Sequence, residues 1–227
     1  MVLVSTGCLL AGVVLLQFTE WLFLVLGAFV SGFQGHILWN DFVFYIQNNK
    51  WDQQQVVFLY LFPEILFFLL FLTFLVRKNH FMGKNRNFSL WNSWLFLLVM
   101  IKTLFLPFWQ IMKNRGIHYA FSWLSLSETI QGDIGFFLLG LFFFYVFRMS
   151  SMFSYGLVIR ENKFLKPRDI LPQLFYIWLI PFLIFSLVIY FISGGHLEFS
   201  IICCLVGIAG SLLINIPVIG NYQVIAK

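Results

Sequence analysis

Three ionisable residues, Glu20, Glu64 and Lys102, lie inside long apolar stretches of the sequence. A charged side chain at the centre of a bilayer costs about 2.5–3.5 kcal/mol or more, so such residues pair, contact water or mark a functional site. Glu20 and Lys102 each lie roughly ten residues from the same face of the expected membrane, so their depths match. We therefore predict that Glu20, Lys102 and Glu64 form an intramembrane polar site.

Two interpretations of this site stay open. Glu20 and Lys102 form a buried ion pair that fixes helix packing, or they belong to a proton- or substrate-linked site in a polar cavity. Glu64 follows Pro63, and a proline inside a helix frees carbonyl oxygens that a polar site can use. The alternative for Glu64 is a carboxyl group that extends toward the outer interface.

Histidine and carboxylate side chains, the ligands that suit zinc or non-haem iron, gather in segments between the apolar stretches. These residues lie in separate segments and show neither HExxH nor HxxxH spacing. We therefore predict solvated polar residues rather than a metal site. The weak candidates for metal ligands are His36, His118, His196 and Glu198.

The sequence lacks the motifs of well-known cofactor and nucleophile chemistry. It contains no GxxxxGK[ST] phosphate loop, no GxSxG nucleophile turn and no haem-like histidine pair within its apolar stretches. We predict no bound cofactor and no catalytic residue, and we favour a protein that is not an enzyme.

Membrane-spanning helices must position the polar residues. Hydrophobic residues make up 61% of the 227 residues, charged residues make up 10%, and the mean hydropathy is +0.90. Stretches of about 18 or more apolar residues indicate transmembrane helices, because lipid offers no partner to an unpaired backbone group. We predict an all-α, polytopic integral membrane protein with a single transmembrane domain over residues 1–227. Its six helices, joined by short loops, cover residues 8–30, 56–76, 91–111, 134–152, 171–193 and 199–219.

The basic residues are distributed unequally between the two sides of this arrangement. The second and fourth connecting segments and the C-terminal residue carry ten of the 14 Lys and Arg residues, whereas the other side carries three. Cytoplasmic loops are enriched in basic residues, so both termini are predicted to lie in the cytoplasm. We expect a multi-pass protein of a bacterial inner membrane or an organellar membrane.

Several segments are expected to contact partners as well as the lipid bilayer. Residues 118–131 predict a short amphipathic helix at the outer interface, and residues 149–170 suit either anionic lipid or a cytoplasmic partner. Small residues recur every four positions in the sixth span, which predicts close packing against other membrane subunits or a second copy. These are Cys203, Gly207 and Ser211. Lys and Arg form no folded basic surface, so we expect no nucleic-acid partner.

Three functions fit these features. The first is a transport or permease component whose polar path includes Glu20, Glu64 and Lys102. The second is a non-catalytic structural subunit of a larger membrane complex. The third is an intramembrane enzyme that uses the histidine and carboxylate residues of the outer side.

Overall fold

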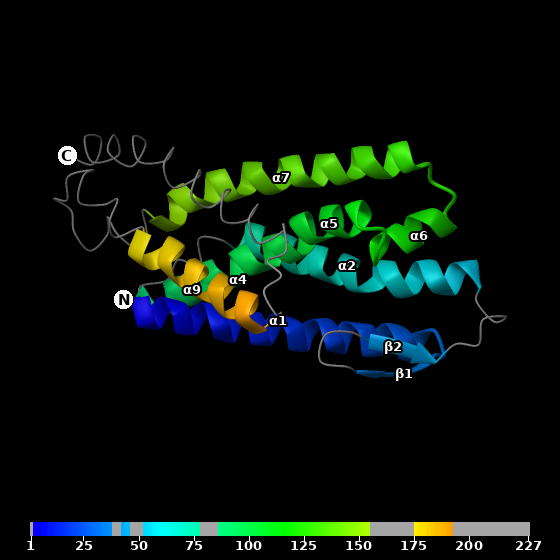
Figure 1. Ribbon diagram of the computed structural model, residues 1–227, viewed down its shortest axis with the longest axis horizontal. Coiled ribbons are helices and arrows are strands. Elements are labelled where there is room, and N and C mark those ends of the chain that lie inside the picture. Colours follow the sequence, from blue (N-terminus) through cyan, green and yellow to red (C-terminus); the bar gives the residue numbers. More distant parts are fainter. Residues whose placement is uncertain (1, 38–41, 46–51, 78–85, 155–174, 193–227) are drawn as a thin grey trace. The chain divides into compact units, whose positions relative to one another are not determined.

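The computed structural model describes residues 2–37, 42–45, 52–77, 86–154 and 175–192 (Figure 1). These residues form helices and one short hairpin. In chain order the elements are α1 (Val2–Val30), β1 (Gln34–Ile37), β2 (Phe42–Tyr45), α2 (Gln53–Val76), α4 (Arg86–Met100), the π turn η2 (Ile101–Phe105), α5 (Leu106–Met112), α6 (Ile117–Trp123), α7 (Glu128–Ser154), the π turn η4 (Phe175–Leu179) and α9 (Ile180–Ile192).

Four helices of the described chain are long and apolar enough to cross a membrane. They cover Val2–Val30, Gln53–Val76, Asn87–Met112 and Glu128–Val146. The predicted helical fold is confirmed to this extent, and these helices are compatible with a membrane protein, whereas the count of six spans and the location of the termini stay predictions. The fifth predicted span overlaps η4 and α9, whose apolar part is shorter, and the sixth, residues 199–219, lies outside the described residues.

The chain divides into two compact units. Unit 1 takes in the described residues of 1–13, 74–98 and 141–227, and unit 2 takes in those of 14–73 and 99–140. The single domain over residues 1–227 stays a prediction.

Unit 1 is built around two tryptophans and a serine. The rings of Trp94 and Trp178 lie 4.9 Å apart, and Trp94 Nε1 donates a hydrogen bond of 2.8 Å to Ser5 Oγ. Ser5 Oγ in turn donates to the carbonyl oxygen of Ile177 at 2.5 Å. Pro181 follows Ile177 by four residues and has no N–H to offer this carbonyl, so the serine hydroxyl supplies the missing donor. Helix α1 begins at Val2, before the predicted start at residue 8, and so places Ser5 in this core.

Unit 2 packs α2 through a single stripe of side chains spaced three or four residues apart, which is one face of an α-helix. The stripe contacts the second part of α1, where the ring of Phe23 lies 5.2 Å from the ring of Phe67. A Cβ atom placed at Gly27 would lie only 3.2 Å from the Phe62 ring, so this glycine lets α1 and α2 approach closely. The buried stripe of α2 consists of Val56, Leu59, Pro63, Phe67 and Phe71.

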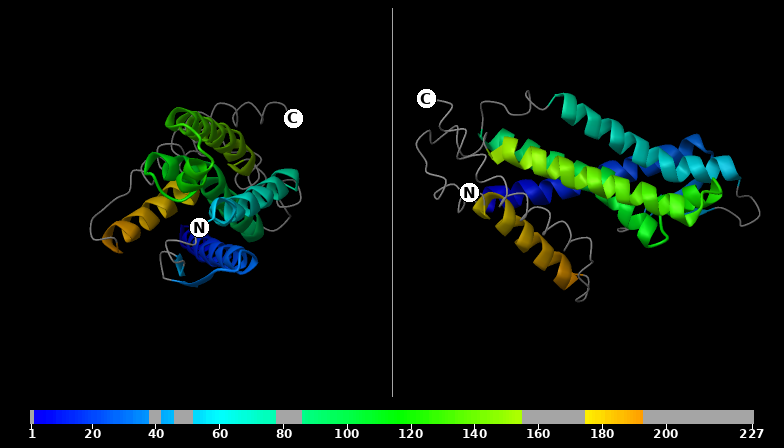
Figure 2. Two further views of the ribbon diagram at one scale, coloured as in Figure 1. Left: turned by 90° about the vertical axis from the view of Figure 1, so that its right-hand side faces the viewer. Right: turned by 90° about the horizontal axis from the view of Figure 1, so that it is seen from above.

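The first half of α7 lies beside α5 in unit 2 (Figures 1 and 2). A Cβ atom at Gly135 would lie 3.4 Å from Phe108, and the rings of Phe108 and Phe136 lie 5.7 Å apart. Helix α7 begins at Glu128, six residues before the predicted boundary at residue 134. Ser127 extends the helix because its hydroxyl accepts a hydrogen bond from the N–H of Ile130 at 3.4 Å. The predicted interfacial segment 118–131 is therefore divided between α6 and the start of α7.

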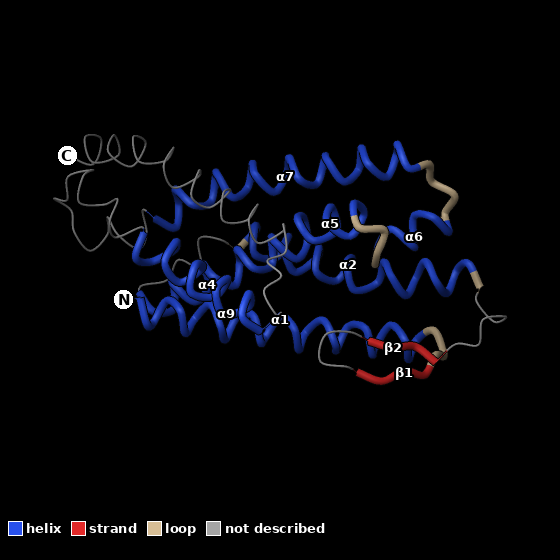
Figure 3. The backbone as a smooth tube through the Cα atoms, viewed as in Figure 1, coloured by secondary structure: helices blue, strands red, loops and turns tan. Residues whose placement is uncertain are grey.

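A β-hairpin follows α1 and was not predicted. Strands β1 and β2 pair antiparallel, with Gln34 opposite Tyr45 and Ile37 opposite Phe42 (Figure 3). The sequence of β2, Phe-Val-Phe-Tyr, consists of β-branched and aromatic residues that favour strands. The all-α prediction, which joined its helices by short loops, did not include this strand pairing.

Both π turns of the described chain end two residues before a proline. The turn η2 ends at Phe105 before Pro107, and η4 ends at Leu179 before Pro181. The N–H of Leu106 donates to the carbonyl of Ile101, five residues back, which is the π pattern. A proline ring collides with the carbonyl four residues before it, and widening the preceding turn relieves this collision.

Candidate polar site in unit 2

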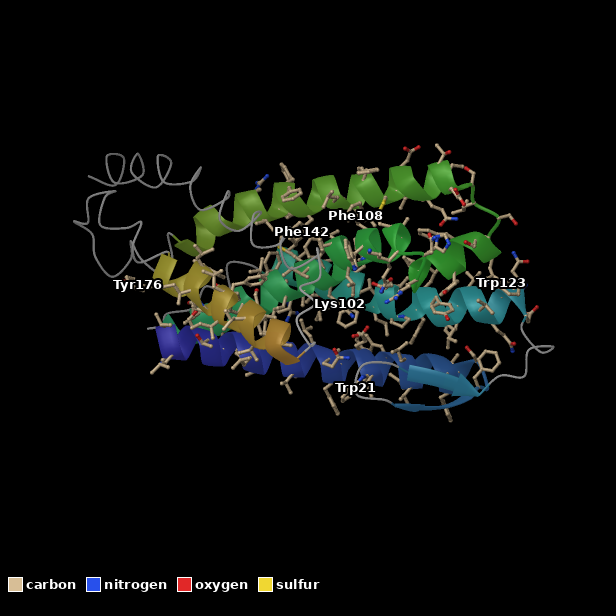
Figure 4. All side chains as sticks on the ribbon, in the orientation of Figure 1. Trp21, Lys102, Phe108, Trp123, Phe142 and Tyr176 are labelled. Atoms are coloured by element: carbon tan, nitrogen blue, oxygen red, sulfur yellow. The ribbon has the colours of Figure 1, made fainter. Side chains whose placement is uncertain are left out.

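The centre of the candidate site is an ion pair between α1 and η2. The ammonium of Lys102 pairs with Oε1 of Glu20, and the side chains are 16% and 23% exposed, respectively. Lys102 also lies over the ring of Phe67 at 5.7 Å from its centroid, a distance suited to a cation–π contact. Figure 4 shows Lys102 in the layer of side chains between α1 and α2 in unit 2.

The π turn is fixed to α2 next to the ion pair. The hydroxyl of Thr103, which is buried, donates to the backbone carbonyl of Phe67 at 3.3 Å. Phe67 is itself fully buried and contacts Phe23 of α1. The neighbours of Lys102 and Glu20 therefore hold the three segments that carry the charges.

Glu64 joins this group from α2. Its carboxyl group interacts electrostatically with Lys102 and with Glu20, and it accepts a hydrogen bond from the side chain of Gln110. Oε2 of Glu64 is buried and has no hydrogen-bond partner among the described residues. The structure thus brings together all three residues of the predicted polar site.

Gln110 is held in one orientation by the start of α6. Its Oε1 accepts a hydrogen bond from the N–H of Ile117 at 3.1 Å. A backbone N–H can only donate, so this contact fixes the amide oxygen at Ile117 and leaves the amide NH₂ group for Glu64. Gly116 makes the contact possible, because a Cβ atom there would lie 2.6 Å from the amide of Gln110.

The charges of the site do not balance when all three groups are ionised. Glu20 and Glu64 contribute two negative charges and Lys102 contributes one positive charge, so the sum is −1. Lys102 forms its ion pair with Glu20, and the described residues contain no direct ion pair between Lys102 and Glu64. One carboxyl group is therefore left without a paired cation in the described structure.

The four candidate metal ligands do not belong to this polar site: two lie in other elements, and two lie outside the described residues. His36 lies in β1 opposite Val43, and His118 lies in α6, where its Nε2 is 3.3 Å from the hydroxyl of Ser122. No three His, Cys, Asp or Glu side chains come together within the described ranges. His196 and Glu198 lie outside the described residues.

The predicted partner segments are also largely outside the description. Residues 149–154 belong to α7, and 155–170 are not described. The small residues of the sixth predicted span, Cys203, Gly207 and Ser211, lie outside the described residues as well.

Two members of the site were not predicted from the sequence. Gln110 is neutral and lies near the end of an apolar stretch, so it did not stand out among the charged residues. Its spacing of eight from Lys102, about two helical turns, was the available signal. Gly116 has a positive φ of 53° and precedes α6, and no sequence pattern links such a glycine to a side chain six residues earlier.

Comparison of the chain with protein-family models, with curated proteins and with solved structures finds no match. The function must therefore be argued from the site itself.

Proposed function

We propose that the protein is a component of a membrane transport system whose polar path includes Glu20, Glu64 and Lys102. The observation that supports this proposal is the carboxyl group of Glu64, whose Oε2 is buried and has no hydrogen-bond partner among the described residues. The nearby cation, Lys102, is already paired with Glu20. A purely structural pair needs no third charge, because each additional buried charge costs free energy. A group that binds and releases an ion accounts for the extra carboxyl.

In this role the protein crosses the membrane several times, and both of its termini lie on the side rich in basic residues. Support for the membrane comes from the four long apolar helices and from the exposed apolar side chains on α1, among them Leu3 and Phe29. A bacterial inner membrane or an organellar membrane suits the distribution of basic residues.

Ion movement in reconstituted vesicles tests the transport function. The full-length protein is placed in liposomes that contain pH-sensitive and sodium-sensitive dyes, and a membrane potential is imposed with valinomycin and potassium. We expect ion movement above that of protein-free liposomes, and we expect Glu20→Gln and Glu64→Gln to abolish it. Glu128→Gln is the matched control, because Glu128 is exposed at the start of α7. Movement no faster than in protein-free liposomes would overturn the proposal.

A structural subunit of a larger complex is the second candidate, and the ion pair itself favours it. Glu20 and Lys102 are in direct contact and mostly shielded from solvent, as expected for charges that fix helix packing. Purification in mild detergent distinguishes the two functions. Stoichiometric membrane partners, together with no ion movement by the isolated protein, would favour the subunit.

A further inference from the structure

We propose that Glu64 is the proton-binding group of the polar site, that Gln110 is its positioning residue, and that Glu20 and Lys102 form the adjacent ion pair that does not exchange the proton. This inference rests on the proposed transport function and deepens it by naming the ion and the atom that binds it. The juxtaposition that carries it is a buried carboxyl oxygen, a fixed amide donor and an adjacent ion pair, all within unit 2.

The two carboxyl groups of the site have different environments. Glu20 is in direct contact with the ammonium of Lys102, whereas Glu64 interacts with that ammonium only at longer range. A carboxylate next to a cation is stabilised in its charged form, and protonating it would strand the buried cation. Glu64 has no such partner, so a proton can bind to it and leave without breaking an ion pair.

The surroundings of Glu64 suit a proton rather than a metal cation. A metal cation requires several oxygen ligands, for example six to eight for Ca²⁺. The oxygen of the Gln110 amide is already occupied by the N–H of Ile117, so the amide presents donors to the carboxyl group. A proton needs only one carboxyl oxygen, and Oε2 of Glu64 is unoccupied by any hydrogen bond within the described chain.

The hydrogen bond from Gln110 helps the carboxyl group of Glu64 to release its proton. The amide donor offers the carboxylate a hydrogen bond once the proton has left. The backbone of α6 holds the donor in place through Ile117, so this hydrogen bond depends on the connection between α5 and α6.

Labelling with the apolar reagent dicyclohexylcarbodiimide tests this assignment, because the reagent enters membranes and reacts with protonated carboxyl groups. The full-length protein in liposomes is labelled over a range of pH values, and the modified peptides are identified by mass spectrometry. We expect Glu64 to be labelled and Glu20 to stay unlabelled, with labelling of Glu64 falling as the pH rises. Sodium at fixed pH should not protect Glu64, since the site binds a proton.

Variants separate the roles of the individual residues. Gln110→Leu should shift the pH midpoint of Glu64 labelling, because the carboxyl group loses a charge-assisted hydrogen bond. Gln110→Asn should recover part of that shift if the amide reaches the carboxyl group. Lys102→Met should make Glu20 reactive, because the carboxyl group loses its cation. A folded Gln110→Leu protein whose labelling midpoint is unchanged would overturn the positioning role.

The outcomes also distinguish this inference from the transport function. Ion movement that requires Glu64 but with labelling confined to Glu20 would overturn the inference and leave the transport proposal standing. Reversible labelling of Glu64 without ion movement would leave the proton site standing and overturn transport. Protection of Glu64 by sodium at constant pH would contradict the choice of a proton.

Discussion

The hydroxyl of Ser5 donates to the carbonyl oxygen of Ile177, and so joins residues 172 positions apart in the sequence. Ser5 also accepts a hydrogen bond from the indole of Trp94, so this one oxygen connects three helical segments of unit 1. The Ile177 carbonyl needs an external donor because Pro181 cannot supply the helical one.

Replacing Ser5 with alanine is expected to destabilise the protein by about 1–3 kcal/mol, because two buried polar groups lose their partner. Thermal unfolding in detergent measures the effect. Ser186→Ala is the matched control: its hydroxyl is also buried but bonds within one helix to the carbonyl of Phe182, at 2.8 Å. Equal losses in the two variants would contradict the special role of Ser5.

Pro181 provides a second control for the role of Ser5. Pro181→Ala restores a backbone N–H that can donate to the Ile177 carbonyl. We therefore expect Ser5→Ala to cost less in the Pro181→Ala background than in the natural sequence. An unchanged cost would show that the serine acts elsewhere.

Glu20→Ala alone should be more harmful than Glu20→Ala combined with Lys102→Met, because the single change strands a buried cation. Breaking a fully buried pair costs about 3–5 kcal/mol, and the partial exposure of both side chains makes this an upper bound here. A double-mutant cycle on expression level and thermal stability measures the coupling.

Lys113 supplies the control for that cycle. Its side chain is exposed and its ammonium lies 5.0 Å from the ring centroid of Trp109, whereas Glu20 is paired with Lys102. Glu20→Ala and Lys113→Met should therefore have additive effects. Additive losses for Glu20 and Lys102 as well would show that these two residues are not partners.

Gly116→Ala is expected to destabilise unit 2 more than Gly32→Ala. Both glycines have a positive φ, 53° and 72°, so a side chain strains the backbone at either position by about 1–3 kcal/mol. A Cβ atom at Gly116 would in addition collide with the amide of Gln110, whereas nothing lies within 4 Å at Gly32. Thermal unfolding of the two variants separates the collision from the backbone strain. Equal destabilisation would indicate that Gln110 adapts without cost.

The predicted topology places residues 77–90 and 160–168 on the same face of the membrane. Single cysteines introduced at Lys84 and Lys163 should react with an impermeant maleimide from the same side of oriented vesicles, and one at Lys113 from the opposite side. The natural cysteines are first replaced, so that the introduced thiol alone reacts. Reaction of Lys84→Cys and Lys163→Cys from opposite sides would overturn the six-span arrangement.

The helices of the described chain were largely predictable from the length and apolar composition of their segments. A run of about 20 apolar residues must be helical in lipid whatever its neighbours are, so the first four spans follow from composition. Their ends were less predictable. The start of α7 at Glu128 depends on Ser127, whose hydroxyl accepts a hydrogen bond from the N–H of Ile130.

The site was predictable only in its charged members. Glu20, Glu64 and Lys102 stood out because a charge in an apolar stretch is costly, and equal depth related Glu20 to Lys102. The role of Gln110 depends on Gly116 and on the N–H of Ile117, which meet it only after the chain has turned between α5 and α6. The hairpin was not predicted because its strands, of four residues each, are too short to show the alternation of apolar and polar residues that marks a strand.

The π turn at Ile101–Phe105 sets the direction in which the side chains of the following helix, α5, point around the helix axis. One residue more or fewer turns the later side chains by about 100°, the rotation per residue of an α-helix. In a regular α-helix without this wider turn, the same residues would direct Gln110 away from Glu64, while Trp94, which precedes the turn, would keep its hydrogen bond to Ser5. The wider turn thus determines whether the amide and the carboxyl group meet.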